Sequence, residues 1–243
     1  LQYGIGQVPE AVTDAILAKG VMDLGIHTEL FADAMQRLVE AGVVTNRHTF
    51  IHVNCAMSSI FLSSDQEGYD WLDYNSSAQS RPCDYTNSVL NIAREPNMVA
   101  INGAIGVDLH GNIWADSLQA RRIYSGVGGQ SDFLRGAALS PGGVPIIALR
   151  STTEKGISKI VEKCPEGITT TAIAADQVVI VTEHGAFDPW GLSFSERVVA
   201  IAHLAEPETR HQLLKQIYDS PVYHHPAQAL KDRVPKGIIP LNF

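Results

Sequence analysis

The chain has 243 residues, and its 18 basic and 26 acidic side chains give a formal net charge of −8, which makes nucleic acid and anionic membranes poor partners. Hydrophobic residues make up 45% and charged residues 18%, which predicts a globular protein with a sizeable core and excludes a disordered one. No uncharged apolar stretch approaches the roughly 20 residues of a membrane-spanning helix.

The N-terminal part alternates short apolar runs with turn residues. Residues 4–9 open a helical pattern that Gly20 is suited to end in a left-handed conformation. A short buried strand is predicted over 21–26, a helix over 30–41, and a further strand over 49–53.

A long polar stretch, 63–96, is rich in Ser, Asp, Asn and Tyr and has no strong periodicity. Stretches of this length are usually functional or part of an interface. Its aromatic residues, such as Tyr69 and Trp71, indicate that it packs. A short strand is predicted directly after it, over 99–101.

The C-terminal part has two apolar, β-branched runs, 144–149 and 177–181, which are typical of central strands. Helices are predicted over 194–204 and 207–218, and the tail over 221–243 carries four prolines and is expected to lie on the surface. Strands that alternate with helices predict an α/β fold with an open, mostly parallel sheet flanked by helices.

The three cysteines, Cys55, Cys83 and Cys164, are widely spaced and form no CxxC motif. This spacing excludes a disulfide scaffold and a cysteine-based zinc site, and it fits a reducing cytoplasm. The chain begins Leu1-Gln2-Tyr3, without Met or a signal-like region, which indicates a piece of a longer polypeptide.

Several catalytic motifs are absent from the sequence, namely G-x-S-x-G, a phosphate loop ending in GKS or GKT, and HExxH. His224 and His225 are adjacent in the proline-rich tail, where a solvated surface pair is favoured over a metal site. No metal site is predicted.

Two glycine-rich segments are candidates for binding a ligand through the backbone. Gly4-Ile5-Gly6 precedes a helix, which is either a tight turn or a close approach of backbone to an anion. The segment 124–133 contains Gly126, Gly128 and Gly129, whose N–H groups can bind phosphate or an oxyanion, although a plain loop would have the same composition.

Glu29 follows the predicted strand and precedes the predicted helix, where ligands bind in open α/β sheets. A glutamate at a helix start is also explained by the helix dipole, so its position alone does not assign it a role.

In their order, six segments resemble the C-terminal half of the acetyl-CoA hydrolase/transferase family, which includes 4-hydroxybutyrate and succinyl-CoA:acetate CoA-transferases. They are GIGQVPEAV from Gly4, LGIHTEL from Leu24, NMVAINGAIGVDLHGNIWADS from Asn97, YSGVGGQSDFLRGA from Tyr124, VTEHG from Val181 and SERVVAIAHL from Ser195.

The resemblance implies a CoA-transferase-like catalytic domain over 1–220, with 63–96 as an insertion-like stretch. Enzymes of the family are about twice as long and have their active site between two α/β halves. An N-terminal half is therefore expected as a partner of this chain, and a homo-oligomer is expected by precedent.

The same resemblance makes Glu29 the nucleophile, with coenzyme A as substrate and no permanently bound cofactor. Acyl-CoA and carboxylic acids are the expected substrates. Residues for the oxyanion and for CoA are expected at the following positions: Gly4, Ile5, Gly6, Gln7, Val8, Asn102, Gly126, Gly128, Gly129 and Gln130.

The sequence departs from the family pattern over 186–191, where L-R-G is common, and over 54–59, where F-x-x-G-S is common. Both departures could reshape the acyl or acceptor pocket. For Glu183, which follows an apolar strand, a structural hydrogen-bonding role is favoured over a catalytic one.

The sequence leaves three further functions open besides CoA transfer. Hydrolysis of acyl-CoA would use the same glutamate and differ in the access of water. A CoA-binding subunit without catalysis would not need Glu29. A nicotinamide-dependent dehydrogenase is the weakest alternative, because a third fingerprint glycine is lacking.

Overall fold

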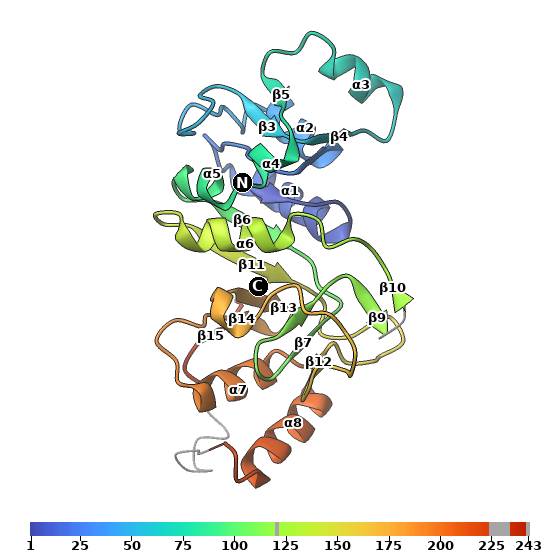
Figure 1. The fold of residues 1–243 in the computed structure, drawn as a ribbon, viewed down its shortest axis with the longest axis vertical. Coiled ribbons are helices and arrows are strands. Elements are labelled where there is room, and N and C mark those ends of the chain that lie inside the picture. The colour runs from blue at the N-terminus through green and yellow to red at the C-terminus, as the bar shows by residue number, and fades with distance from the viewer. Residues whose placement is uncertain (120–121, 224–233, 242–243) are drawn as a thin grey trace. The chain divides into compact units, whose positions relative to one another are not determined.

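The computed structural model describes residues 1–119, 122–223 and 234–241 (Figure 1). The chain divides into two compact units. The first unit comprises Leu1–Asn102 and Gly129–Pro145, and the second comprises Gly103–Gly128 and Ile146–Phe243.

The first unit contains short strands that pair in parallel, namely β1 with β6, β2 with β4, and β3 with β5. Its strands are β1 (Gln2–Tyr3), β2 (Leu30–Ala32), β3 (Ala56–Ser58), β4 (Ile60–Leu62), β5 (Ala78–Ser80) and β6 (Val99–Asn102). Its helices are α1 (Gln7–Lys19), α2 (Asp33–Glu40), α3 (Gln66–Leu72), α4 (Cys83–Thr86), α5 (Val89–Arg94) and α6 (Gln130–Leu139).

The second unit contains most of β11 (Val144–Ala148), which pairs in parallel with β13, while β13, β14 and β15 pair antiparallel. Its other strands are β7 (Gly106–Asp108), β8 (Ile113–Trp114), β9 (Ser117–Gln119), β10 (Arg122–Ile123), β12 (Ile160–Val161), β13 (Val179–Thr182), β14 (Gly185–Phe187) and β15 (Ile238–Ile239). Its helices are α7 (Phe194–His203) and α8 (Pro207–Asp219), with a single 3-10 turn at Ala174–Asp176.

These pairings confirm the predicted α/β class and mostly parallel sheet. The helices α1, α7 and α8 and the strands β6, β11 and β13 lie close to the predicted ranges. Gly20 ends α1 in the left-handed conformation, with φ of 63°. Of the proline-rich tail, the described part supplies β15, whereas His224 and His225 lie outside the described residues.

The strand predicted over 49–53 is wrong, because its backbone has other partners. The N–H groups of Phe50 and Ile51 donate to the Glu95 carboxylate, and His52 adopts a positive φ of 26°. Neither feature is compatible with a strand ladder.

The strand predicted over 21–26 is also wrong, since Leu24 makes only an isolated bridge to Val44 after Asp23 turns with φ of 64°. The helix predicted over 30–41 begins later, at Asp33, because residues 30–32 pair with β4 instead.

Two apolar clusters hold the first unit together. One is built around α2 and β2 and includes the buried Phe31, Met35 and Leu38. The other joins α5, α6 and β6, in which α6 contacts both α5 and β6 (Figure 1), through residues such as Ile92 and Phe133.

A Cβ at Gly136 of α6 would lie 2.4 Å from the Ile92 side chain of α5. Only glycine therefore allows these two helices to approach so closely. This close contact matters for the site described below, because α6 begins directly after Gly129.

Leu38→Ala should lower the free energy of unfolding by about 2–5 kcal/mol, because Leu38 is fully buried in α2 and its truncation leaves a cavity. Leu90→Ala makes the same change in α5 at a side chain that is 75% exposed, and it should cost less than about 0.5 kcal/mol. Urea denaturation followed by circular dichroism measures both. Equal losses would contradict this account of the core.

Candidate active site

Glu29 lies between two short stretches of parallel pairing, not at a strand-to-helix junction. His27 forms an isolated bridge with Met57, and β2 begins at Leu30. The Glu29 carbonyl oxygen accepts hydrogen bonds from the N–H groups of Ser59 and Ile60, both at 2.9 Å. The backbone that carries the carboxylate is therefore fixed by two amides.

The Glu29 carboxylate is half-buried, and each of its oxygens accepts a hydrogen bond from a distant part of the chain. Asn87 Nδ2 donates to Oε1 at 2.8 Å, and the Gly129 N–H donates to Oε2 at 2.9 Å. Gly129 is the N-cap of α6, a helix of 10 residues. The carboxylate thus lies at the positive end of a helix, where negative charge is stabilised.

Gly129 leaves no room for a side chain. A Cβ there would lie 2.7 Å from Asn87 Nδ2 and 3.1 Å from Glu29 Oε2. Glycine at this position allows the backbone N–H to reach the carboxylate while Asn87 reaches it from another side.

Asp132 in the first turn of α6 is a second carboxyl group that Glu29 influences. Burial raises the pKa of Asp132; the Arg135 charge opposes this shift and the negative charge of Glu29 adds to it. The start of α6 therefore combines backbone donors with two acidic side chains.

A buried pair, His27 and Glu95, supports the segment that carries Asn87. His27 is 3% exposed. Its Nε2 donates to the Thr86 carbonyl oxygen at 2.8 Å, since a carbonyl can only accept, and its Nδ1 lies 3.8 Å from Glu95 Oε1. Glu95 also accepts from the N–H groups of Phe50 and Ile51, at 2.7 and 3.1 Å.

The pKa of Glu95 is set by opposing effects. Burial alone would raise it, but the nearby His27 side chain and the hydrogen bonds from the Phe50 and Ile51 N–H groups lower it, and the net direction is downward from the ordinary 4.5. The ionised form of Glu95 therefore stabilises the folded state more than the protonated form does.

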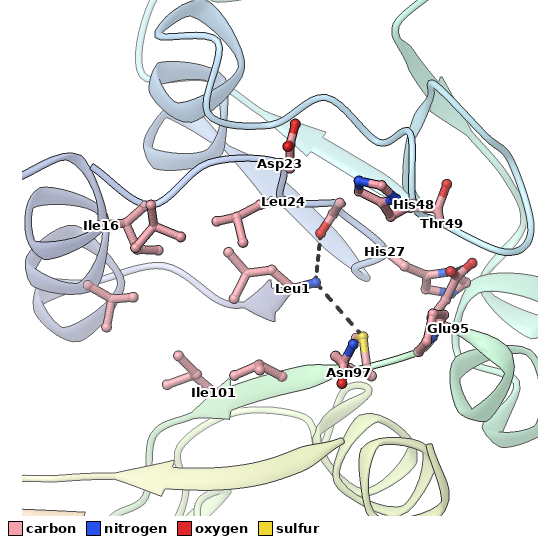
Figure 2. Close-up of a pocket in the computed structure, with 16 residues that line it drawn as sticks. Leu1, Ile16, Asp23, Leu24, His27, His48, Thr49, Glu95, Asn97 and Ile101 are labelled. Carbon is pink, nitrogen blue, oxygen red and sulfur yellow. Dashed lines mark hydrogen bonds and ion pairs between the residues drawn. The ribbon is translucent and has the colours of Figure 1, made fainter. Parts of the chain in front are cut away.

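The first unit also contains a mainly apolar cavity of about 520 Å³ (Figure 2). His27 and Glu95 lie together on its wall, and Ile16 and Ile101 are among its apolar lining residues (Figure 2). The Leu1 amino group donates to the Gly25 carbonyl at 2.7 Å. The sequence-predicted site residues do not line this cavity.

Of the predicted binding residues, the structure brings Gly129 together with Glu29. Gly4, Ile5, Gly6, Gln7 and Val8 lie instead around the turn between β1 and α1, where Gly6 is the N-cap with φ of 110°.

Asn102 forms a reciprocal amide pair with the buried Gln2, with N–O distances of 3.0 and 3.3 Å. It ends β6. The predicted contact of Asn102 with CoA stays a prediction.

The other residues predicted in the glycine loop belong to different units of the structure. Gly126 and Gly128 are exposed and belong to the second unit, and Gly128 has φ of 58°. Gln130 belongs to the first unit and is the first residue of α6.

Sequence reasoning missed Asn87 and Thr86, which lie in the polar stretch and have no motif of their own. It singled out Ser59 only as part of the departure at 54–59. The length of the polar stretch was the available signal. In the second unit, Glu183 accepts hydrogen bonds from the N–H and hydroxyl of Ser151, at 2.8 and 2.7 Å. Its role stays a prediction.

Within the described ranges, no group of three or more His, Cys, Asp or Glu side chains is placed to hold a metal ion. Over the same residues, every helix is too short or too polar to cross a bilayer.

The structure is thus an α/β fold in which two hydrogen-bond donors hold the half-buried carboxylate of Glu29. Residues 65–217 match the acetyl-CoA hydrolase/transferase C-terminal domain. The chain belongs to this family.

Several known proteins are similar to this chain in sequence and in fold over most of its length. The 4-hydroxybutyrate coenzyme A transferase of Clostridium kluyveri is 37% identical over 89% of this chain and 50% of the relative. The crystal structure of RipA from Yersinia pestis is 36% identical, with a TM-score of 0.82 over 90% of this chain and 48% of that one. The chain therefore spans about half the length of these relatives. A more distant relative, an acetyl-CoA hydrolase of Candida albicans, is 29% identical over 92% of this chain and 41% of its own length.

Glu95→Gln should destabilise the protein by about 1.5–3 kcal/mol at neutral pH, because hydrogen bonds to a buried charged group are lost or weakened. The pKa of Glu95 is lower in the folded state, so its contribution is complete above the ordinary 4.5 and disappears as pH falls through the folded-state pKa. Unfolding free energies measured against pH for both proteins test this.

The exposed Glu67→Gln is the control, and it should follow the wild type at every pH. A difference between wild type and Glu95→Gln that stayed constant down to the lowest pH would contradict this assignment of the ionised form.

Proposed function

We propose that this chain carries the catalytic glutamate of a CoA-transferase, which moves CoA from an acyl-CoA to an acceptor carboxylate. Glu29 is the proposed nucleophile. The observation that carries the proposal is the half-buried carboxylate of Glu29, with one hydrogen-bond donor on each oxygen.

In the first half of the proposed reaction, a carboxylate oxygen of Glu29 attacks the thioester carbonyl of the acyl-CoA. The carbon–sulfur bond breaks, giving an acyl-glutamyl anhydride and CoA thiolate. The thiolate then attacks the glutamyl carbonyl, which releases the donor carboxylate and leaves a glutamyl-CoA thioester.

In the second half, the acceptor carboxylate attacks the glutamyl thioester and forms a new anhydride with release of thiolate. The thiolate attacks the acceptor's carbonyl, giving the new acyl-CoA and restoring the Glu29 carboxylate. Each step exchanges one activated acyl bond for another of similar energy, so the sequence balances with no oxidant or reductant.

The two donors at Glu29 suit this chemistry because each attack on the glutamyl carbonyl develops negative charge on an oxygen. The Gly129 N–H is held by the backbone, so it needs little reorganisation as the charge forms. Loss of such a donor typically costs about 3–4 kcal/mol in the barrier.

The complete enzyme is proposed to be about twice as long, with an N-terminal half as the partner of this chain and a homo-oligomeric assembly in the cytoplasm. The proposed length is supported by the relatives, of which the chain covers about half, whereas the assembly and the compartment stay predictions. Their names favour carboxylic acids as substrates, and the departures at 54–59 and 186–191 are where this chain's choice of acid would differ. CoA contacts are proposed for Gly4–Val8, Asn102, Gly126, Gly128, Gly129 and Gln130, with no resident cofactor.

Hydrolysis of acyl-CoA by the same glutamate is the second candidate, favoured by the acetyl-CoA hydrolase among the relatives. The two activities separate when an acceptor carboxylate is added. A transferase forms a new acyl-CoA, whereas a hydrolase only releases CoA.

Glu29→Gln should abolish the covalent CoA adduct and lower transfer by at least about 10³-fold, because an amide cannot replace the attacking carboxylate. The native polypeptide that carries this chain is incubated with a panel of acyl-CoAs and analysed by intact and peptide mass. We expect a CoA adduct on the peptide that holds Glu29.

Glu67→Gln, the same change at an exposed helix start, should keep the adduct. Full transfer activity of Glu29→Gln, with no adduct in either protein, would reject Glu29 as the nucleophile. Binding of CoA with neither adduct nor transfer in wild type would favour a CoA-binding subunit.

Gly129→Ala should slow adduct formation by roughly 10- to 100-fold, because the new methyl group displaces the Asn87 amide or the Glu29 carboxylate from its position. The fold should survive, since both groups end flexible side chains. Gly103→Ala adds a methyl group into open space and should stay within about twofold of wild type. Rapid-quench mass analysis compares them, and equal rates for all three proteins would contradict the geometry proposed for the donors.

A further inference from the structure

Asn87 can present either end of its amide to Glu29, and only one end is favourable. The nitrogen donates a hydrogen bond to a carboxylate, whereas the amide oxygen would repel it. In the structure the nitrogen faces Glu29, at 2.8 Å from Oε1. The contacts that hold the amide in this orientation therefore also determine whether a donor or an acceptor faces the Glu29 carboxylate.

Thr86 supplies the hydroxyl on the other end of the amide. The Thr86 side chain is fully buried, and its Oγ1 donates to Asn87 Oδ1 at 3.0 Å. If Asn87 turned its amide over, this hydroxyl would face an NH₂ group and lose its acceptor. The interaction therefore favours the amide orientation that serves Glu29.

Ser59 completes the chain of hydroxyl groups. Its Oγ forms a hydrogen bond with Thr86 Oγ1. Because the Thr86 proton is used toward Asn87, Ser59 is the donor in this bond. Hydrogen bonds that run in one direction strengthen one another, and here the direction is from Ser59 through Thr86 and Asn87 to Glu29.

Hydrogen bonds to the backbone of Ser59 and Thr86 hold the two residues that carry the hydroxyl groups. The Ser59 N–H donates to the Glu29 carbonyl oxygen at 2.9 Å. The Thr86 carbonyl oxygen accepts from His27 Nε2 at 2.8 Å, and His27 is in turn buried beside Glu95 (Figure 2). The backbones of Ser59 and Thr86 are therefore held where their two hydroxyl groups meet.

We infer that Thr86 is a positioning residue for the reaction at Glu29: its buried hydroxyl, with Ser59 behind it, orients the Asn87 amide toward the carboxylate. The inference rests on the proposed function for its catalytic consequence. Thr86 contacts Asn87 and not the Glu29 carboxylate, so its removal changes turnover more than substrate binding.

Two variants separate hydrogen bonding from packing. Thr86→Val keeps the shape and removes the hydroxyl, whereas Thr86→Ser keeps the hydroxyl and removes a methyl group. In the native polypeptide, Thr86→Val should lower kcat by roughly 10- to 100-fold with KM for acyl-CoA within about twofold, and Thr86→Ser should stay within about threefold of wild type. A packing role predicts the reverse order, with Val nearer to wild type than Ser.

Thr13→Val is the matched control. Thr13 is equally buried, and its hydroxyl bonds to Tyr3 Oη at 2.7 Å, away from Glu29. It should lose stability and keep its kcat. If Thr13→Val lowered kcat as much as Thr86→Val, the effect would be one of general stability, and the inference would be overturned.

A second readout does not depend on activity. The Asn87 side-chain amide protons, observed by NMR with selective ¹⁵N-asparagine labelling, should be protected from exchange in wild type and Thr86→Ser and exposed in Thr86→Val. Protection that persists in Thr86→Val overturns the inference. Glu29→Gln is assayed in parallel: if it retains transfer, the proposed nucleophile fails while the amide signal still decides the role of Thr86.

Discussion

The first unit is organised around one carboxylate that is shared by two distant donors. Asn87 and Gly129 lie 58 and 100 positions from Glu29 in the sequence, and both donate to it. A half-buried carboxylate is stabilised by such partners, and a fold that supplies them must hold Glu29, Asn87 and the start of α6 in fixed positions. The close packing of Gly136 on Ile92 ties α6 to α5, and hence to the segment that carries Asn87. The packing of α6 on α5 therefore helps to place both hydrogen-bond donors of Glu29.

Much of the fold could be predicted from the sequence because the elements concerned have local signals. The helices α1 and α8 have clear caps and periodicity, and the central strands β11 and β13 are β-branched runs. The failures have a common cause. Residues 49–53 look like a strand by composition, but the N–H groups of Phe50 and Ile51 bond to the carboxylate of Glu95, 45 and 44 positions away. Local propensity cannot anticipate a partner that only tertiary structure provides.

The candidate site shows the same limit. Glu29 and Gly129 could be found from a family resemblance in their motifs, whereas Asn87 and Thr86 lie in a stretch with no periodicity. Their importance depends on orientation: an asparagine is a donor or an acceptor to its neighbour according to which hydrogen bonds hold its other end. Such a choice is made by three-dimensional contacts and leaves no pattern in residue spacing.

The last described strand, β15, has a consequence of a different kind. It is only two residues long, yet it pairs with β14, whose three residues are all buried. Removal of β15 would leave the backbone donors and acceptors of β14 unpaired along an apolar edge, and such an edge can pair with strands of other molecules. The two residues of β15 therefore keep this edge of β14 covered within the described part of the chain.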